Sequence, residues 1–167
     1  IEMHRLYLEA GANIITACTF GANRLKFDNL EEITTAAITN AKEACKGYED
    51  AYVALDIGPT GKMLEPLGDL PFEEAVSVFA ETVRIGAKAG ADLILIETMN
   101  DSYETKAAVI AAKENCNLPV FVTNAYSDDC KLMTGADPAA MVAMLEGMGA
   151  DAIGVNCSLG PKALLGV

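Results

Sequence analysis

The stretch AGADLILIETM, residues 89–99, decides the fold class of this chain. A glycine that can end a helix is followed by a run of consecutive apolar side chains, and the run ends at the carboxylate of Glu97. The run is too short for a helix and is apolar at successive positions, which is typical of a strand buried on both faces of a parallel sheet. The sequence therefore predicts a strand over 92–99 that follows a helix.

Four other apolar segments repeat this pattern and predict four more strands. They are NIITACTF (13–20), YVALDIG (52–58), PVFVTNAY (119–126) and DAIGVNCS (151–158). The segment between each pair of strands is long enough for one helix, which is the spacing of βα units. We expect one helix before the first strand, one helix after each of the first four strands, and only a few residues after the fifth strand.

Helix-start signals lie in the segments between the predicted strands. Each signal contains two or more residues of types that favour the first turn of a helix, namely a capping side chain, a proline or an early acidic residue. The signals are Asp28 with Glu31, Pro71 with Glu73 and Glu74, Asp101 with Glu104, and Asp137 with Pro138.

The alternation of strands and helices predicts an α/β protein. We expect a (β/α)8 barrel, present here as an incomplete barrel of about five βα units, because polar residues gather where the strands end. A doubly wound sheet usually carries a glycine-rich phosphate turn after its first strand, and no GxGxxG motif or P-loop occurs. We interpret residues 1–167 as one partial barrel domain that lacks the first strand and the C-terminal strands. Its open edges would favour self-association.

Composition excludes several classes of partner. The 167 residues are 51% hydrophobic, and 12 basic against 24 acidic side chains give a formal net charge of −12. This charge argues against nucleic acid or an anionic membrane surface as a partner, since both are polyanions. No apolar stretch approaches the ~18 residues of a membrane helix. Five cysteines without a CxxC pair favour a reducing, cytoplasmic setting.

Three strand-end side chains are the candidates for chemistry. Cys157 is either a buried small hydrophobe or a thiolate that acts as a zinc ligand or nucleophile. Glu97 is either a structural carboxylate or the partner of a cationic substrate group, such as the ammonium of an amino acid. Asp56 resembles Glu97 in position, but the following IGPTG makes local capping of a tight loop a strong alternative. Cys130 lies in the loop after the preceding strand, from which it could approach Cys157.

Four motifs in order along the chain resemble the homocysteine-binding domain of the homocysteine S-methyltransferase family. They are HRLYLEAGANIITACTFGANRLKF (4–27), DIGPTGKMLEPLGDL (56–70), LILIETMNDSYETKAA (93–108) and GVNCSLGP (154–161). The likeness is greatest to the cobalamin-dependent type within that family.

The resemblance implies a barrel that binds zinc through three cysteines and activates the thiol of homocysteine. Zinc lowers the pKa of such a thiol, and the resulting sulfur nucleophile attacks the methyl group of methylcobalamin to give methionine. The expected partners are homocysteine and the cobalamin-binding and folate-binding modules of the parent protein. By this likeness Cys157 is a zinc ligand and Glu97 binds the amino group. The remaining expected substrate contacts are Thr19, Phe20, Gly21 and Asn156.

Departures from the family pattern limit what this segment is expected to do alone. The family's other two zinc cysteines form an adjacent pair near the end of the barrel, and this chain stops at Val167. Because one ligand of three does not hold zinc tightly, we expect the 167 residues to be inactive by themselves, and we assign them no catalytic residue. The alternatives are a non-catalytic ligand- or partner-binding barrel fragment and a related methyltransferase that uses betaine or S-methylmethionine. An unrelated aldolase or isomerase would show a Schiff-base lysine or a phosphate loop, and neither is found.

Overall fold

A computed structural model describes residues 1–167 and contains one sheet of five parallel strands. The strands are β1 (Ile14–Thr16), β2 (Tyr52–Ile57), β3 (Leu93–Met99), β4 (Val120–Asn124) and β5 (Ala152–Val155). The helices are α1 (Glu2–Glu9), α2 (Leu30–Cys45), α3 (Phe72–Ala89), α4 (Ser102–Asn115), α5 (Pro138–Gly147) and α6 (Pro161–Leu164). All five predicted strands and the predicted alternation with helices are confirmed.

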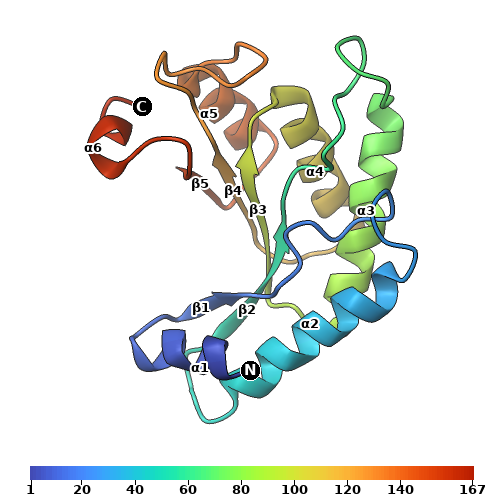
Figure 1. Cartoon of the computed structure of the whole chain (residues 1–167), viewed down its shortest axis with the longest axis vertical. Coiled ribbons are helices and arrows are strands. Elements are labelled where there is room, and N and C mark those ends of the chain that lie inside the picture. The colour runs from blue at the N-terminus through green and yellow to red at the C-terminus, as the bar shows by residue number, and fades with distance from the viewer.

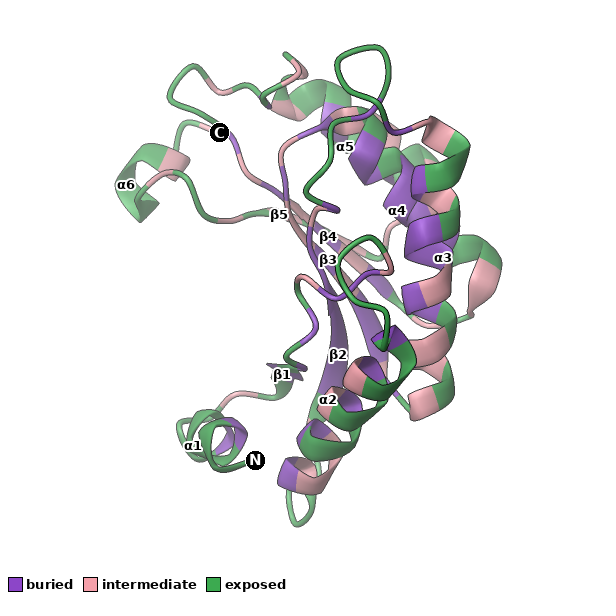
Figure 2. Ribbon diagram, turned by 45° about the vertical axis from the view of Figure 1, so that its right-hand side comes forward, coloured by how far each residue is buried: buried purple, intermediate pink, exposed green.

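The order of the strands in the sheet separates a barrel wall from a doubly wound sheet. The strands lie side by side in chain order, β1-β2-β3-β4-β5, and every neighbouring pair is parallel. A doubly wound sheet would reverse direction at a switch point and place helices on both faces. Here α2, α3, α4 and α5 lie along one side of a curved sheet, and the opposite, concave side is open (Figures 1 and 2). This is the arrangement of an incomplete (β/α)8 barrel.

The hydrophobic core lies between the sheet and its covering helices. Ile94 and Ile96 of β3 are fully buried there, whereas Leu95 and Glu97 alternate with them, face the concave side and are only partly buried. Helix α3 approaches the sheet closely at Gly86, where a Cβ would lie 2.5 Å from a methyl carbon of Leu55. Such packing holds β2 and β3 rigidly against the helices, so the side chains at the ends of these strands have fixed positions.

Two helix starts follow the predicted capping chemistry. Asp137 accepts a hydrogen bond from the backbone N–H of Ala140 at 2.8 Å, with Pro138 in the first turn of α5. Asp101 likewise accepts from the backbone N–H of Tyr103 at 2.8 Å and begins α4.

Other details of the predicted starts are wrong. The N-cap of α2 is Asn29 rather than Asp28, and no side-chain capping bond forms there. Pro71 is the N-cap residue of α3 and precedes its first turn. Glu104 does not complete a capping box with Asp101, because its carboxylate is engaged by the loop after β2.

All five cysteines are free thiols. Cys45 and Cys116, at the ends of α2 and α4, are partly buried and pack against the core. None of the helices combines the length and the apolar character that a membrane crossing requires.

Candidate functional site

The polar side chains that end β3 and β5 meet at the carboxyl edge of the sheet. They border a cavity of about 500 Å³, whose lining includes Thr98, Lys131, Met133, Cys157 and Ser158. The Cys157 thiol is exposed at this cavity, so the interpretation of Cys157 as a buried hydrophobe is wrong. In βα barrels, this edge of the sheet carries the chemistry.

The side-chain amide of Asn156 is the centre of a hydrogen-bond network that joins three strands. Its Nδ2 donates to Glu97 Oε2 and to Thr98 Oγ1, both at 2.8 Å. Its Oδ1 accepts from Thr123 Oγ1 at 2.9 Å and from the backbone N–H of Thr98 at 3.1 Å. Four well-formed bonds orient the amide completely, and through it they fix the carboxylate of Glu97.

The backbone turns sharply at the same point on both strands. Thr98, Cys157 and Ser158 have φ values of 60°, 56° and 59°, in the left-handed region that side chains other than glycine rarely adopt. Each such residue costs about 1–3 kcal/mol and persists where the surroundings impose it. Asn156 Nδ2 lies 3.5 Å from Cys157 Sγ, and Thr98 Oγ1 lies 3.8 Å from the same sulfur. The thiol is therefore held by neutral hydrogen-bonding groups rather than by packing.

The loop after β1 is attached to the end of β2. The Thr19 hydroxyl donates to the carbonyl of Asp56 at 2.8 Å and accepts from the Asp56 N–H at 3.0 Å, so this buried hydroxyl has no hydrogen left to donate to a ligand. The Phe20 ring is 45% exposed and lies against Gly58, where a Cβ would collide with it. Gly21 follows in the same turn and is half-buried. Thr19 thus positions Phe20 and Gly21 beside β2.

Asp56 connects this loop with the β3–β5 network. It is 7% exposed and lies close enough to Glu97 on the neighbouring strand for the charge of Glu97 to act on it. Burial, then the nearby charge of Glu97 and the hydrogen bond to it, raise the pKa of Asp56 to about 8. The side chain makes no capping bond to the IGPTG loop, so that interpretation of Asp56 is wrong.

That loop is held instead by Glu104, whose role the sequence did not indicate. The buried Glu104 carboxylate accepts from the backbone N–H of Thr60 at 2.8 Å and from its hydroxyl at 2.6 Å. Burial raises the pKa of Glu104, and the two bonds from Thr60 oppose that shift. The sequence predicts a local cap for Glu104, because a capping pattern involves only residues that are close together along the chain.

The 167 residues do not by themselves form a metal centre. No group of three or more His, Cys, Asp or Glu side chains is arranged to hold an ion. Cys130 Sγ lies 3.8 Å from the carbonyl of Gly166, and no contact joins it to Cys157. Cys157 is therefore one potential thiolate ligand without a second one beside it.

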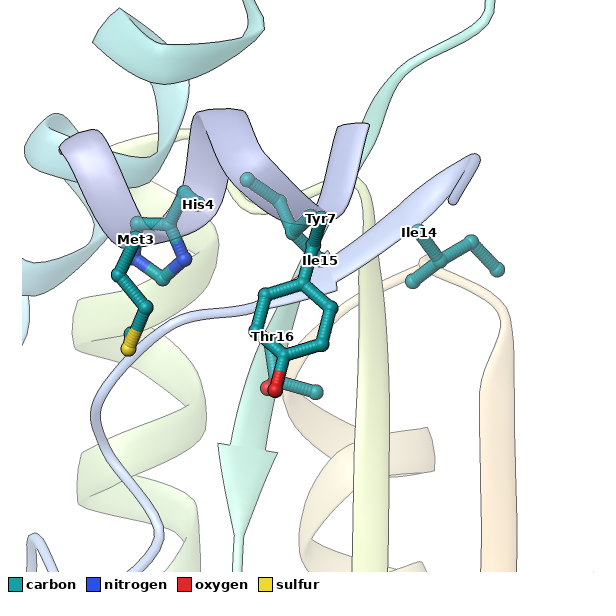
Figure 3. Close-up of a pocket in the computed structure, with 6 residues that line it drawn as sticks. All are labelled: Met3, His4, Tyr7, Ile14, Ile15 and Thr16. Atoms are coloured by element: carbon teal, nitrogen blue, oxygen red, sulfur yellow. The ribbon is translucent and has the colours of Figure 1, made fainter. Parts of the chain in front are cut away.

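A second cavity, of about 360 Å³, lies between α1 and β1 and shares no residue with the cavity at Cys157 (Figure 3). It is lined by Met3, His4, Tyr7, Ile14, Ile15 and Thr16. His4 is 5% exposed, and its burial lowers its pKa. The ends of β3 and β5, which carry Glu97, Asn156 and Cys157, contribute nothing to this cavity.

Comparison with known proteins places the chain in a family. The model of the family described as homocysteine S-methyltransferase matches residues 1–167. The methionine synthases of Mycobacterium leprae and Mycobacterium tuberculosis are 30% and 29% identical to the chain over 177 residues. Each match covers 97% of this chain, which spans only 15% of the length of either relative.

Solved structures share the fold. The apo form of the homocysteine methyltransferase MmuM from Escherichia coli superposes with a TM-score of 0.82 at 22% identity, over 98% of this chain and 62% of that one. Its metallated form gives a TM-score of 0.85 at 20% identity, over 98% and 64%.

Proposed function

The chain belongs to the homocysteine S-methyltransferase family, and on that premise we propose that residues 1–167 form the part of a homocysteine-binding barrel that presents Cys157, Asn156 and Glu97 to the substrate. The protein that contains this segment would transfer a methyl group from methylcobalamin to the sulfur of homocysteine and release methionine. The observation that carries the proposal is the single hydrogen-bonded unit formed by these residues at the ends of β3 and β5.

The two ends of this unit suit the two ends of the substrate. Homocysteine has an α-ammonium group at one end and a thiol at the other. Glu97 offers a carboxylate to the ammonium, and a charge-assisted bond of this kind is among the stronger hydrogen bonds in proteins. Cys157 lies at the other side of Asn156, where the substrate sulfur would be placed. Because Asn156 bonds to Glu97 and approaches Cys157, it sets the spacing between the two recognition points.

Phe20 supplies an apolar wall for the same site. Its ring is nearly half exposed and is held by Gly58, whose N–H donates to the Phe20 carbonyl at 2.8 Å. An apolar side chain at this position would contact the methylene carbons of the substrate and exclude water from the sulfur.

Zinc is the metal we propose for the complete site. Cys157 would supply one thiolate, and the remaining ligands would have to come from outside residues 1–167, since the described side chains form no three-ligand group. When bound, zinc would lower the pKa of the substrate thiol and so provide a nucleophile at neutral pH. The matched methionine synthases are much longer than this chain. A protein of similar length that contains this chain would have further domains, and we propose that they include cobalamin-binding and folate-binding modules.

The test compares cysteine variants in the protein as its natural gene encodes it. Cys157→Ala is expected to lose zinc and methyl transfer while the fold stays intact, as judged by circular dichroism. Cys116→Ala is the matched control, because Cys116 is a partly buried thiol at the end of α4 with a bond only to the carbonyl of Ala112. Normal zinc content and turnover in Cys157→Ala would contradict the assignment.

A second variant tests the other end of the substrate. Glu97→Ala is expected to raise the homocysteine concentration needed for half-maximal rate, with zinc content unchanged. Assays with methylcobalamin, betaine and S-methylmethionine as separate donors identify the methyl source. An unchanged homocysteine dependence in Glu97→Ala, or transfer from betaine alone, would refute the corresponding part of the proposal.

A further inference from the structure

Strand β3 contains a β-bulge beside the candidate site. Ile96 pairs with Val122 of β4, and the next paired residue of β3 is Met99. The partner of Met99 is Asn124, so β3 has two residues in this interval where β4 has one. Bulges are rare between parallel strands and are over-represented next to active sites, where they re-aim a side chain.

The bulge turns two consecutive side chains, Glu97 and Thr98, to the concave face of the sheet. In a regular strand successive side chains alternate between the two faces, which would place residue 98 on the buried face together with Ile96. Instead Met99 is fully buried, and both Glu97 and Thr98 are only partly buried. Thr98 consequently lines the same cavity as Cys157.

The Thr98 hydroxyl lies between the carboxylate of Glu97 and the sulfur of Cys157. It accepts a hydrogen bond from Asn156 Nδ2 at 2.8 Å, and its single hydrogen is left to donate. Glu97 Oε2 lies at 3.3 Å from Thr98 Oγ1, and Cys157 Sγ lies at 3.8 Å from it. Because O–H···O bonds are typically about 2.7–2.8 Å long, the contact with Glu97 does not hold the hydroxyl firmly.

The backbone at Thr98 has a conformation that its own side chain disfavours. Its φ value of 60° lies in the left-handed region, where a β-branched residue is an outlier. The Thr98 N–H donates to Asn156 Oδ1 at 3.1 Å, so the end of β5 holds this residue in place. Residues in such conformations persist where the surroundings impose them, and they cluster at functional sites.

We propose that Thr98 is a positioning residue for Cys157 and that its hydroxyl donates to the Cys157 thiolate when this sulfur binds zinc. The inference rests on the proposed function and adds to it the residue that orients the metal ligand. In the occupied site the substrate ammonium would engage Glu97, and a thiolate would attract the hydroxyl hydrogen more strongly than a thiol, since hydrogen bonds to ionised acceptors are the stronger ones. Groups that hydrogen-bond to a metal ligand fix its direction and so support metal affinity.

Zinc affinity, measured by competition with a chromophoric chelator in the protein as its natural gene encodes it, tests the proposal. Thr98→Val keeps the shape of the side chain but removes the hydroxyl, and it is expected to weaken zinc binding by about 10- to 100-fold. Thr98→Ser keeps the hydroxyl and should bind zinc within about threefold of the natural protein. Thr98→Ala also lacks the hydroxyl, should lose as much affinity as Thr98→Val, and takes its place if Thr98→Val does not fold.

Thr105→Val is the matched control for a merely structural effect. Thr105 is fully buried in α4, where its hydroxyl donates to the carbonyl of Asp101 at 2.6 Å and accepts from Asn124 Nδ2 at 3.2 Å. The same chemical change at this position removes hydrogen bonds outside the site. Urea denaturation should therefore show a loss of stability in Thr105→Val, while its zinc affinity stays that of the natural protein.

Three results would overturn the inference and leave the proposed function to the Cys157→Ala experiment. They are natural zinc affinity in Thr98→Val, an equal loss of zinc affinity in Thr98→Ser, and an equal loss in Thr105→Val. Failure of the natural protein to bind zinc, or full zinc content in Cys157→Ala, would refute the proposed function and the inference together.

Discussion

Replacing Asn156 with alanine removes the amide that joins the strand ends. Four hydrogen bonds of 2.8–3.1 Å are lost, to Glu97, Thr123 and two atoms of Thr98. Each such bond contributes about 0.5–1.5 kcal/mol net, and the lower value applies here because the partners are only partly buried and water can replace the amide. We therefore expect the free energy of unfolding to fall by about 2 kcal/mol, roughly a 30-fold change in the folding equilibrium.

Urea denaturation at pH 7, followed by circular dichroism, measures this change. The midpoint should fall while the dependence of the unfolding free energy on urea stays constant, because the surface exposed on unfolding is nearly unchanged. Asn117→Ala is the control, since Asn117 is exposed and its side chain makes no hydrogen bond within the chain. Asn156→Asp keeps the shape but adds another carboxylate beside Asp56 and Glu97. Its loss of stability should shrink at acid pH, where a protonated carboxyl can donate again.

The reasoning is refuted if Asn156→Ala unfolds within about 0.5 kcal/mol of the natural protein, the range of ordinary surface substitutions. Such a result would mean that water replaces the amide without loss, and that the network does not hold Cys157 in place.

Three further changes test the surroundings of the site. The folded pKa of Asp56, about 8, exceeds its unfolded value near 3.9, so the contribution of this group to stability is lost as pH rises from about 4 to 8. In urea titrations, the free energy of unfolding of Asp56→Asn relative to that of the natural protein should therefore rise by at least about 1 kcal/mol between pH 5 and pH 8. Glu104→Ala should lower the free energy of unfolding by about 2–3 kcal/mol, because it leaves the buried N–H and hydroxyl of Thr60 without an acceptor. Glu104→Gln keeps an acceptor oxygen and should lose much less stability, so equal losses in the two variants would contradict this role. Gly58→Ala should lower the melting temperature through a cost of about 1–3 kcal/mol, because the new methyl group meets the Phe20 ring, and Phe20→Leu in the same chain should relieve part of that loss.

The position of the site was predictable because it depends on strand periodicity. Consecutive apolar residues identified β3 and β5, and the polar residues that follow them had to lie at one edge of a parallel sheet. Glu97, Asn156 and Cys157 were therefore expected at the same place, and the structure joins the first two by a direct hydrogen bond. The start of α5 was predictable for a similar reason, since a cap involves residues only a few positions apart.

Tertiary structure decided the pairings between distant residues. Asp56 and Glu97 are 41 positions apart, and their contact depends on the register of β2 against β3, which neither strand specifies alone. Glu104 appeared to be part of a local cap, yet its carboxylate reaches Thr60, 44 positions earlier in the chain. The left-handed backbone at Thr98 and Cys157 has no local sequence signal such as glycine, because the hydrogen bonds around Asn156 impose it from other strands. The amino-acid sequence by itself thus determined the strands, the helices and the edge of the sheet that carries polar groups. The register of neighbouring strands decided which of those groups lie close together, form hydrogen bonds or are buried.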